Sequence, residues 1–255
     1  MKKVLIATLA LLLIASSSFA GVNFLVAPGV GEGKYAVLGM YATNHQGNLA
    51  NSPMDPQVFD ANSLGVRGCY GVMKDVDLLA AYSMDTLPNV KDYDMKQEAG
   101  STMGLGVKYT MPKSVLDLPV DIAGLFGYEM SSFTVKPDET AIPTAKSVTN
   151  LTTLGLGCIV SKDMGTYVPY GAIGYKMLTK TMDKKFFGYT IDDIGGSGLA
   201  WNIGVMIGIA QDQAVAIEYN TENISWQSTS TKGKKLDDAS AVSVSGISLG
   251  YVYVF

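Results

Sequence analysis

The sequence predicts an all-β protein, a single closed antiparallel up-and-down transmembrane β-barrel of ten strands. Three observations predict this fold: apolar residues alternate with small or polar ones, short and long connections follow one another in turn, and the alternation continues to the last residue. Chain ends are usually polar and frayed unless a neighbour holds them. The run 247–255 instead ends in Phe255, and a closed barrel gives such a strand a partner on both edges.

The N-terminal residues have the composition of a secretory signal peptide. Residues 1–3 are basic at two positions, residues 4–14 are an uncharged apolar run, and residues 16–20 are mostly small and end in alanine. The apolar run is about half of the roughly 20 residues that a membrane-spanning helix needs. We therefore divide the chain into a signal peptide, residues 1–20, and one membrane β-barrel domain, residues 21–255.

The composition fits an exported membrane barrel. The chain has 28 Gly, more Tyr (14) than Phe (8), and only 16% charged residues. No apolar stretch after the signal peptide is long enough to cross a bilayer as a helix, which leaves alternating strands that show lipid one face only. The formal net charge of −4 argues against a nucleic-acid partner.

Alternation bounded by turn residues places the ten strands. They are expected near 34–43, 63–73, 76–85, 101–111, 118–130, 151–160, 167–178, 198–210, 214–224 and 241–255. The short connections are 73–75, 112–117, 161–165 and 211–213, and the long, polar ones are 44–62, 86–100, 132–150, 179–197 and 225–240. Transmembrane barrels show this rule, with short periplasmic turns and long outer loops, whereas soluble sandwiches do not. Eight and twelve strands are the alternatives.

Two features at the start of the barrel domain leave alternatives open. The first strand has no polar face, because Tyr35 and Val37 alternate with Ala36 and Leu38. Residues 21–33, which precede it, form either a short plug or a disordered leader.

The cost of placing charge in lipid decides which residues face the barrel interior. A Lys or Arg on the lipid face at the midplane costs about 2–4 kcal/mol, so charged residues within strands are expected in the lumen. They are Arg67, Asp77, Lys108, Asp121, Glu129, Lys176, Glu218 and Glu222. Their strand neighbours sort accordingly: in strand 198–210, Trp201 and Ile203 point outward and Ala200 and Asn202 inward.

The interior charges and glycines each have two interpretations. The charges can pair across the lumen into a network that fills it, or they can line a narrow ion path; isolated buried charges are costly, which favours the network. Inward glycines can clear a channel or let a small barrel curve and accept large neighbours. Barrels of eight strands are just filled by side chains, and ten strands lie near that end of the range.

The two cysteines, Cys69 and Cys158, are expected on strands that are not neighbours, one pointing inward and one outward. A disulfide needs Cα atoms within about 7 Å, so we expect two free thiols.

The whole mature chain resembles the bacterial outer-membrane β-barrel family, including small OmpA/OmpX-like and porin-like barrels. The resemblance rests on the strand and loop pattern and on the aromatic residues Tyr251, Tyr253 and Phe255, which are spaced like the signal read by the barrel-assembly machinery. It implies Sec-type export, residence in a Gram-negative-type outer membrane, and contact with its lipid and lipopolysaccharide. The expected role is structural or one of surface interaction, through an unidentified ligand of the loops. A narrow porin-like channel for small solutes is the alternative.

Ten strands are also the architecture of the omptin proteases, and this makes an omptin-like or acyl-transfer enzyme the third candidate. The omptin site pairs Asp residues with an Asp-x-His element. The single histidine, His45, follows Thr43-Asn44 and lacks that Asp, and the pair Asp192–Asp193 lacks a histidine. We therefore expect no enzymatic activity, no catalytic residue, no cofactor and no metal site.

Overall fold

The computed structural model describes residues 26–46, 59–86, 95–112, 118–137, 147–182, 194–226 and 241–255. The signal peptide predicted at residues 1–20 lies outside this part of the chain. Within it, no helix is long and apolar enough to cross a membrane.

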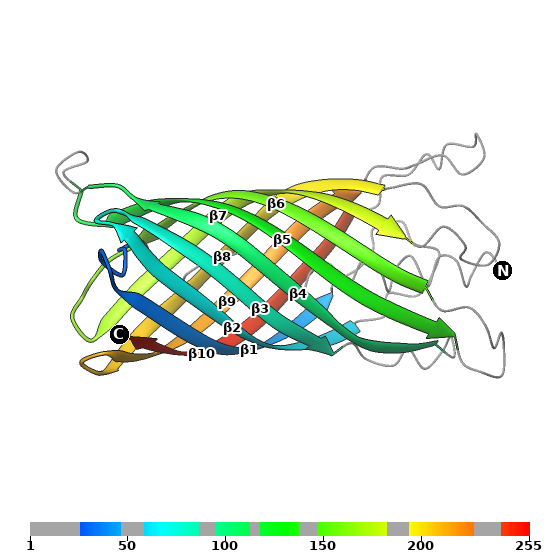
Figure 1. The fold of residues 1–255 in the computed structure, drawn as a ribbon, viewed down its shortest axis with the longest axis horizontal. Helices are drawn as coiled ribbons and strands as arrows, with labels where there is room; N and C mark the ends of the chain where they lie inside the picture. The colour runs from blue at the N-terminus through cyan, green and yellow to red at the C-terminus, as the bar shows by residue number, and fades with distance from the viewer. Residues whose placement is uncertain are drawn as a thin grey trace.

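The described residues form ten strands that close into a barrel, and this confirms the predicted fold class (Figure 1). Each strand pairs antiparallel with the next one in the chain, and the first pairs with the last. The strands are β1 (Tyr35–Gln46), β2 (Phe59–Met73), β3 (Val76–Thr86), β4 (Met95–Thr110), β5 (Asp121–Pro137), β6 (Ser147–Ser161), β7 (Tyr167–Met182), β8 (Ile194–Ala210), β9 (Gln213–Trp226) and β10 (Ala241–Val254).

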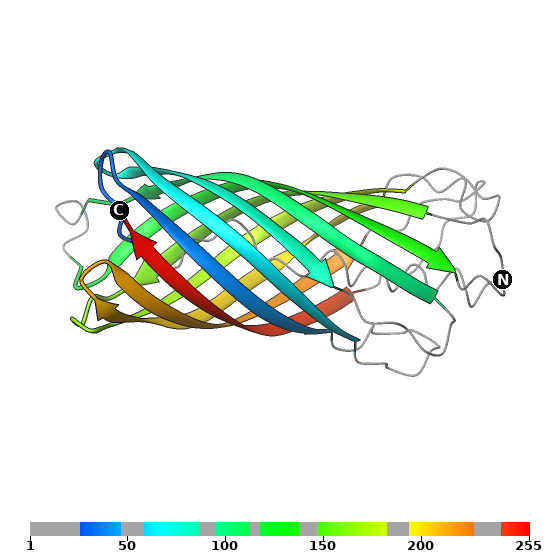
Figure 2. The ribbon, with the colours of Figure 1, turned by 60° about the horizontal axis from the view of Figure 1, so that its bottom comes forward.

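The two ends of the barrel differ in their connections. The links β2–β3, β4–β5, β6–β7 and β8–β9 lie at one end, which we call the short-turn end, and the C-terminus lies there too (Figures 1 and 2). The other end, the loop end, carries the long connections. The strands run between these two ends at a marked tilt to the barrel axis, as in closed barrels generally.

Strands run further at the loop end than the alternation of apolar residues predicts. β4 begins at Met95, six residues before the predicted start, and its ladder with β5 reaches Pro137. Backbone pairing needs no apolar side chains, so the ladder continues past the apolar band into polar sequence. A prediction based on apolar alternation ends where that band ends.

The two faces of the wall have opposite character. In β2, Leu64 and Val66 are exposed on the outside, whereas Arg67 and Cys69 are buried in the interior. The same alternation in β8 leaves Trp201 exposed and its neighbours in the chain buried. Both cysteines are free thiols, and Cys69 is the buried one.

Candidate functional site in the barrel lumen

All eight charged residues assigned to the lumen are buried, none more than 8% exposed. The structure does not bring them into one cluster. Asp77 and Lys108 lie at the short-turn end, and Asp121, at the start of β5, stands opposite Ser161 of β6 in the same region. The remaining five, described below, form a layer further into the barrel.

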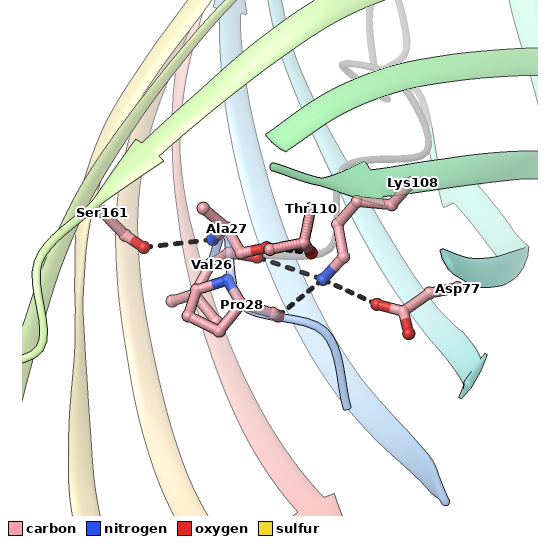
Figure 3. A network of polar contacts seen from close by, with 7 residues as sticks. All are labelled: Val26, Ala27, Pro28, Asp77, Lys108, Thr110 and Ser161. Atoms are coloured by element: carbon pink, nitrogen blue, oxygen red, sulfur yellow. Dashed lines mark hydrogen bonds and ion pairs between the residues drawn. The ribbon is translucent and has the colours of Figure 1, made fainter. Parts of the chain in front are cut away.

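At the short-turn end, Lys108 binds both a carboxylate and the backbone of an N-terminal segment (Figure 3). Its Nζ lies 3.0 Å from Asp77 Oδ2, and it donates hydrogen bonds to the carbonyl oxygens of Val26 (3.2 Å) and Pro28 (2.9 Å). A lysine ammonium has three N–H donors, and these three acceptors match them. This allows Lys108 to be fully buried.

The segment that Lys108 binds, residues 26–34, is an N-terminal plug. The amide of Ala27 donates to Ser161 Oγ (3.1 Å), and Thr110 Oγ1 donates to the Ala27 carbonyl (2.8 Å). The plug thus connects β4 to β6 inside the barrel, as Figure 3 shows. Of the two interpretations of residues 21–33, the described part adopts the plug; residues 21–25 lie outside the described chain.

The plug ends in a glycine-rich turn that leads into β1. This turn holds the plug against β2. Gly31 and Gly33 have φ angles of 95° and 74°, which glycine adopts without strain. The Gly33 amide donates to the Gly71 carbonyl (2.8 Å), and the Gly71 amide donates to the Lys34 carbonyl (2.9 Å). A Cβ on Gly71 would lie 1.9 Å from the Gly31 carbonyl oxygen, so only glycine at position 71 lets the plug approach this closely.

The plug also completes an apolar lining inside the barrel. Ala27 is fully buried in a cluster with inward residues of the wall, and Val26 and Val30 pack against it. Wall members of the cluster include Ala36, Leu38, Cys69, Leu79, Ala123, Leu125 and Ile159. This explains why the first strand has no polar face: its inward residues pack in an apolar interior. Besides charges and glycines, the sequence analysis placed Cys69, Ala200 and Asn202 inward, but it did not identify this apolar lining.

The layer formed by the other five charged residues crosses the middle of the barrel. It centres on Arg67, the single arginine of the chain. The Arg67 guanidinium, on β2, interacts electrostatically with Glu218 and Glu129. Glu218 Oε2 in turn accepts hydrogen bonds from Tyr170 Oη (3.2 Å) and Asn202 Nδ2 (2.9 Å). The layer therefore joins residues of β2, β5, β7, β8 and β9.

The same layer contains a buried ion pair between Lys176 and Glu222. Glu129 interacts electrostatically with Lys176 as well as with Arg67, and so connects the pair to the rest of the layer. The sequence analysis did not place Tyr170 in the lumen. Tyr170 and Lys176 are an even number of residues apart in β7, so their side chains face the same way, and this spacing could have identified Tyr170. Its ring lies over Gly204, where a Cβ would come within 2.5 Å of it.

A third group, towards the loop end, surrounds a carboxylate with hydroxyls. Asp85 accepts hydrogen bonds from Ser63 Oγ and from Thr102 Oγ1 (3.1 Å), and Thr102 also shares a hydrogen bond with Ser131 (2.8 Å). Asp85 is fully buried. Sequence reasoning did not select it, although it has the same parity in β3 as Asp77.

The interior holds a cavity of about 50 Å³ on the side of β5 to β8, next to Glu129 and Lys176. Glycines at positions 155, 157 and 174 contribute to its lining. Ligand pockets usually measure about 300 Å³ or more, so this cavity has the size for a few water molecules.

The described residues include no group of three or more His, Cys, Asp or Glu side chains arranged to hold a metal ion. The backbone of His45 pairs with that of Asp60 near the loop end of β1 and β2; their side chains are outside the description. Residues 192–193, the Asp pair considered above, lie outside the described chain.

Comparisons with known proteins agree with this architecture. The sequence matches the model of a "Family of unknown function (DUF6588)" over residues 71–235, and no curated protein matches it. The translocator domain of the autotransporter NalP from Neisseria meningitidis is 11% identical, with 88% of each chain covered and a TM-score of 0.54. Neisserial surface protein A is 14% identical, with 87% of this chain and 99% of that chain covered and a TM-score of 0.41. The chain belongs to the DUF6588 family of unknown function, and its fold is that of the bacterial outer-membrane β-barrels.

Proposed function

We propose that the protein is an integral outer-membrane barrel with a filled lumen, and that its role is structural or one of surface interaction through the loops. The main support for a filled lumen is that Arg67 interacts with a residue on the opposite side of the barrel. In a closed ring of ten strands β2 and β7 stand opposite each other, and Arg67 of β2 interacts electrostatically with Tyr170 of β7. Side chains from opposite walls, both buried, therefore share the middle of the barrel.

The outer surface supports the membrane placement. Leu64, Leu105, Ile173 and Ile203 are between 58% and 65% exposed on the outer face. In water such a surface would promote aggregation, whereas lipid tails solvate it. At the short-turn end, aromatic residues including Phe255 are exposed, as in the girdles that lie at membrane interfaces.

The route to that membrane belongs to the proposal. Residues 1–20 would direct Sec-type export and be removed, and the C-terminal strand with Tyr251, Tyr253 and Phe255 would be read by the barrel-assembly machinery. Outer-membrane lipid and lipopolysaccharide are the partners of the outer face, and an unidentified ligand that of the loops.

Conductance measurements test the filled lumen. Protein refolded into planar lipid bilayers should give no steady conductance steps, because charged and aromatic side chains occupy the centre of the barrel. Heat-modifiable migration on a gel would show that the inserted protein is folded. Steady single-channel steps would overturn the proposal and favour the narrow porin-like channel.

We also propose that the barrel is not an enzyme. Any hydrolytic activity of the refolded protein should be unchanged in a His45→Ala variant, because His45 is the single histidine. A hydrolytic activity that is present in the unaltered protein and lost in this variant would contradict the proposal.

A further inference from the structure

We propose that the short-turn end of the lumen is a binding site for a short peptide, which the chain fills with its own residues 26–30. The site, which we call the peptide seat, consists of Gly71, Lys108, Thr110 and Ser161 together with the apolar lining around Ala27. It goes beyond the proposed function, and it rests on contacts of the plug rather than on the absence of conduction.

The polar contacts of the seat are made to the backbone of the bound segment. Lys108 donates to the carbonyls of residues 26 and 28, Thr110 donates to the carbonyl of residue 27, and Ser161 accepts from the amide of residue 27. Four hydrogen bonds thus read three consecutive peptide units. Hydrogen bonds to the main chain give affinity for a peptide whatever its side chains.

The side-chain selectivity of the seat comes from its size. Ala27 has no exposed surface and belongs to a buried cluster that includes Leu79, Ala123 and Ile159, so a larger side chain at that position would collide with the wall. At position 29 a Cβ would lie 3.3 Å from both carboxylate oxygens of Asp77, which favours glycine. The seat therefore accepts a peptide with small residues at its second and fourth positions, as in Val-Ala-Pro-Gly-Val.

The wall residues of the seat need an occupant. Without the plug, Lys108 would lose two of the three acceptors described above while remaining in a narrow interior, and the apolar lining would face water. Leaving a buried donor unsatisfied costs about 1–3 kcal/mol and more for a charged group. The empty seat is thus a surface with matched polar and apolar requirements, and a free peptide of the plug sequence satisfies both.

The native thiol of Cys69 reports whether the seat is filled. Cys69 is 3% exposed and belongs to the same buried cluster as Ala27. A Cys158→Ser background removes the second thiol. In refolded full-length protein, Cys69 should react slowly with a charged, water-soluble methanethiosulfonate reagent.

A Gly71→Ala variant should displace the plug and raise the Cys69 modification rate about tenfold or more, because the local opening becomes populated. The matched control is Gly155→Ala, another inward glycine, whose Cβ would have no atom within 4 Å; its rate should equal that of the parent. A Thr110→Val/Ser161→Ala variant weakens the seat without adding bulk and should also raise the rate. Equal rates in the parent and in both seat variants would overturn the plug as a seal.

Addition of peptide in trans tests the seat itself. Deletion of residues 21–30 should expose Cys69, and acetylated, amidated Val-Ala-Pro-Gly-Val added to this variant should restore protection in a saturable manner. The same peptide with the Ala27→Leu change should not protect. If the deletion variant folds, exposes Cys69 and gains no protection from the peptide, the seat is not a peptide-binding site. A conducting parent would overturn only the filled lumen, because the thiol readout does not depend on conductance.

Discussion

At the scale of single residues, the interior is held together by cations that each serve more than one partner. Lys108 joins a carboxylate to two carbonyls of the plug, and Arg67 lies between Glu218 and Glu129. Buried charges are tolerated only when they are paired and hydrogen-bonded. Their placement follows that rule, and it makes single substitutions more damaging than paired ones.

The Lys176–Glu222 pair provides a test of this rule. Lys176→Met should lower the free energy of unfolding by about 3–5 kcal/mol, because it leaves the Glu222 carboxylate buried without its cation. The double variant Lys176→Met/Glu222→Leu should recover most of the loss, since it removes both charges. Urea unfolding in detergent or vesicles measures both values. Lys162→Met, at an exposed lysine, is the control; a double variant as unstable as the single one would contradict the prediction.

The positions of these residues could be predicted from sequence, but their partners could not. Side chains alternate across a strand, so one charged residue fixes the parity of its strand; Lys176 in this way places Tyr170 inside as well. Which residues meet across the lumen depends on strand tilt and stagger. Neither quantity appears in the alternation, so the contact of Arg67 with Glu218 required the structure.

At the scale of elements, the barrel closes where β1 meets β10. The Phe255 amide donates to the Tyr35 carbonyl (2.8 Å), and the two rings stack with centroids 5.0 Å apart. Tyr253 contacts the Phe255 ring edge-on at 4.5 Å. Phe255, which follows the end of β10 at Val254, therefore stabilises the closing seam.

Deletion of Phe255 should sharply reduce the amount of folded protein in the outer membrane, because it removes this stacking and the terminal hydrogen bond. Secretion across the inner membrane should be unaffected, since the signal peptide is unchanged. Phe126→Ala, at another exposed outward aromatic, is the matched control and should assemble better than the deletion. Membrane fractionation with heat-modifiable migration gives the measurement. Equal assembly of the deletion and the parent would contradict a role for the seam.

The ten strands could be predicted from sequence because each carries its own alternation, but the plug could not be distinguished from a disordered leader. Residues 26–34 have no periodicity, and their polar contacts with the wall are made through the backbone, which any sequence has. The one signal was indirect: Ala36 and Leu38 face inward on a strand without a polar face, and such a strand needs an apolar occupant inside. That residues 26–34 are this occupant could be found only from the positions of Lys108 and Ser161 in the folded barrel.

At the scale of the whole molecule, the described residues place two obstructions in series along the lumen. The plug lies at the short-turn end, and the layer centred on Arg67 crosses the middle. Ions that pass through the barrel must cross both obstructions. Either obstruction alone is therefore enough to block the lumen. The plug can therefore leave its seat, or be exchanged, without opening a path across the membrane.

This arrangement predicts that conduction requires the removal of both obstructions. Deletion of residues 21–30 should expose Cys69 and still give no steady steps in a planar bilayer. The variant Arg67→Ala/Tyr170→Ala/Glu218→Ala should also stay silent, because the plug remains. It removes the Arg67 charge together with Glu218, one of the two carboxylates that interact with it, and Glu129 keeps Lys176 as a cation. Only the combination should conduct; full conduction by either variant alone would show that the other element does not block the lumen.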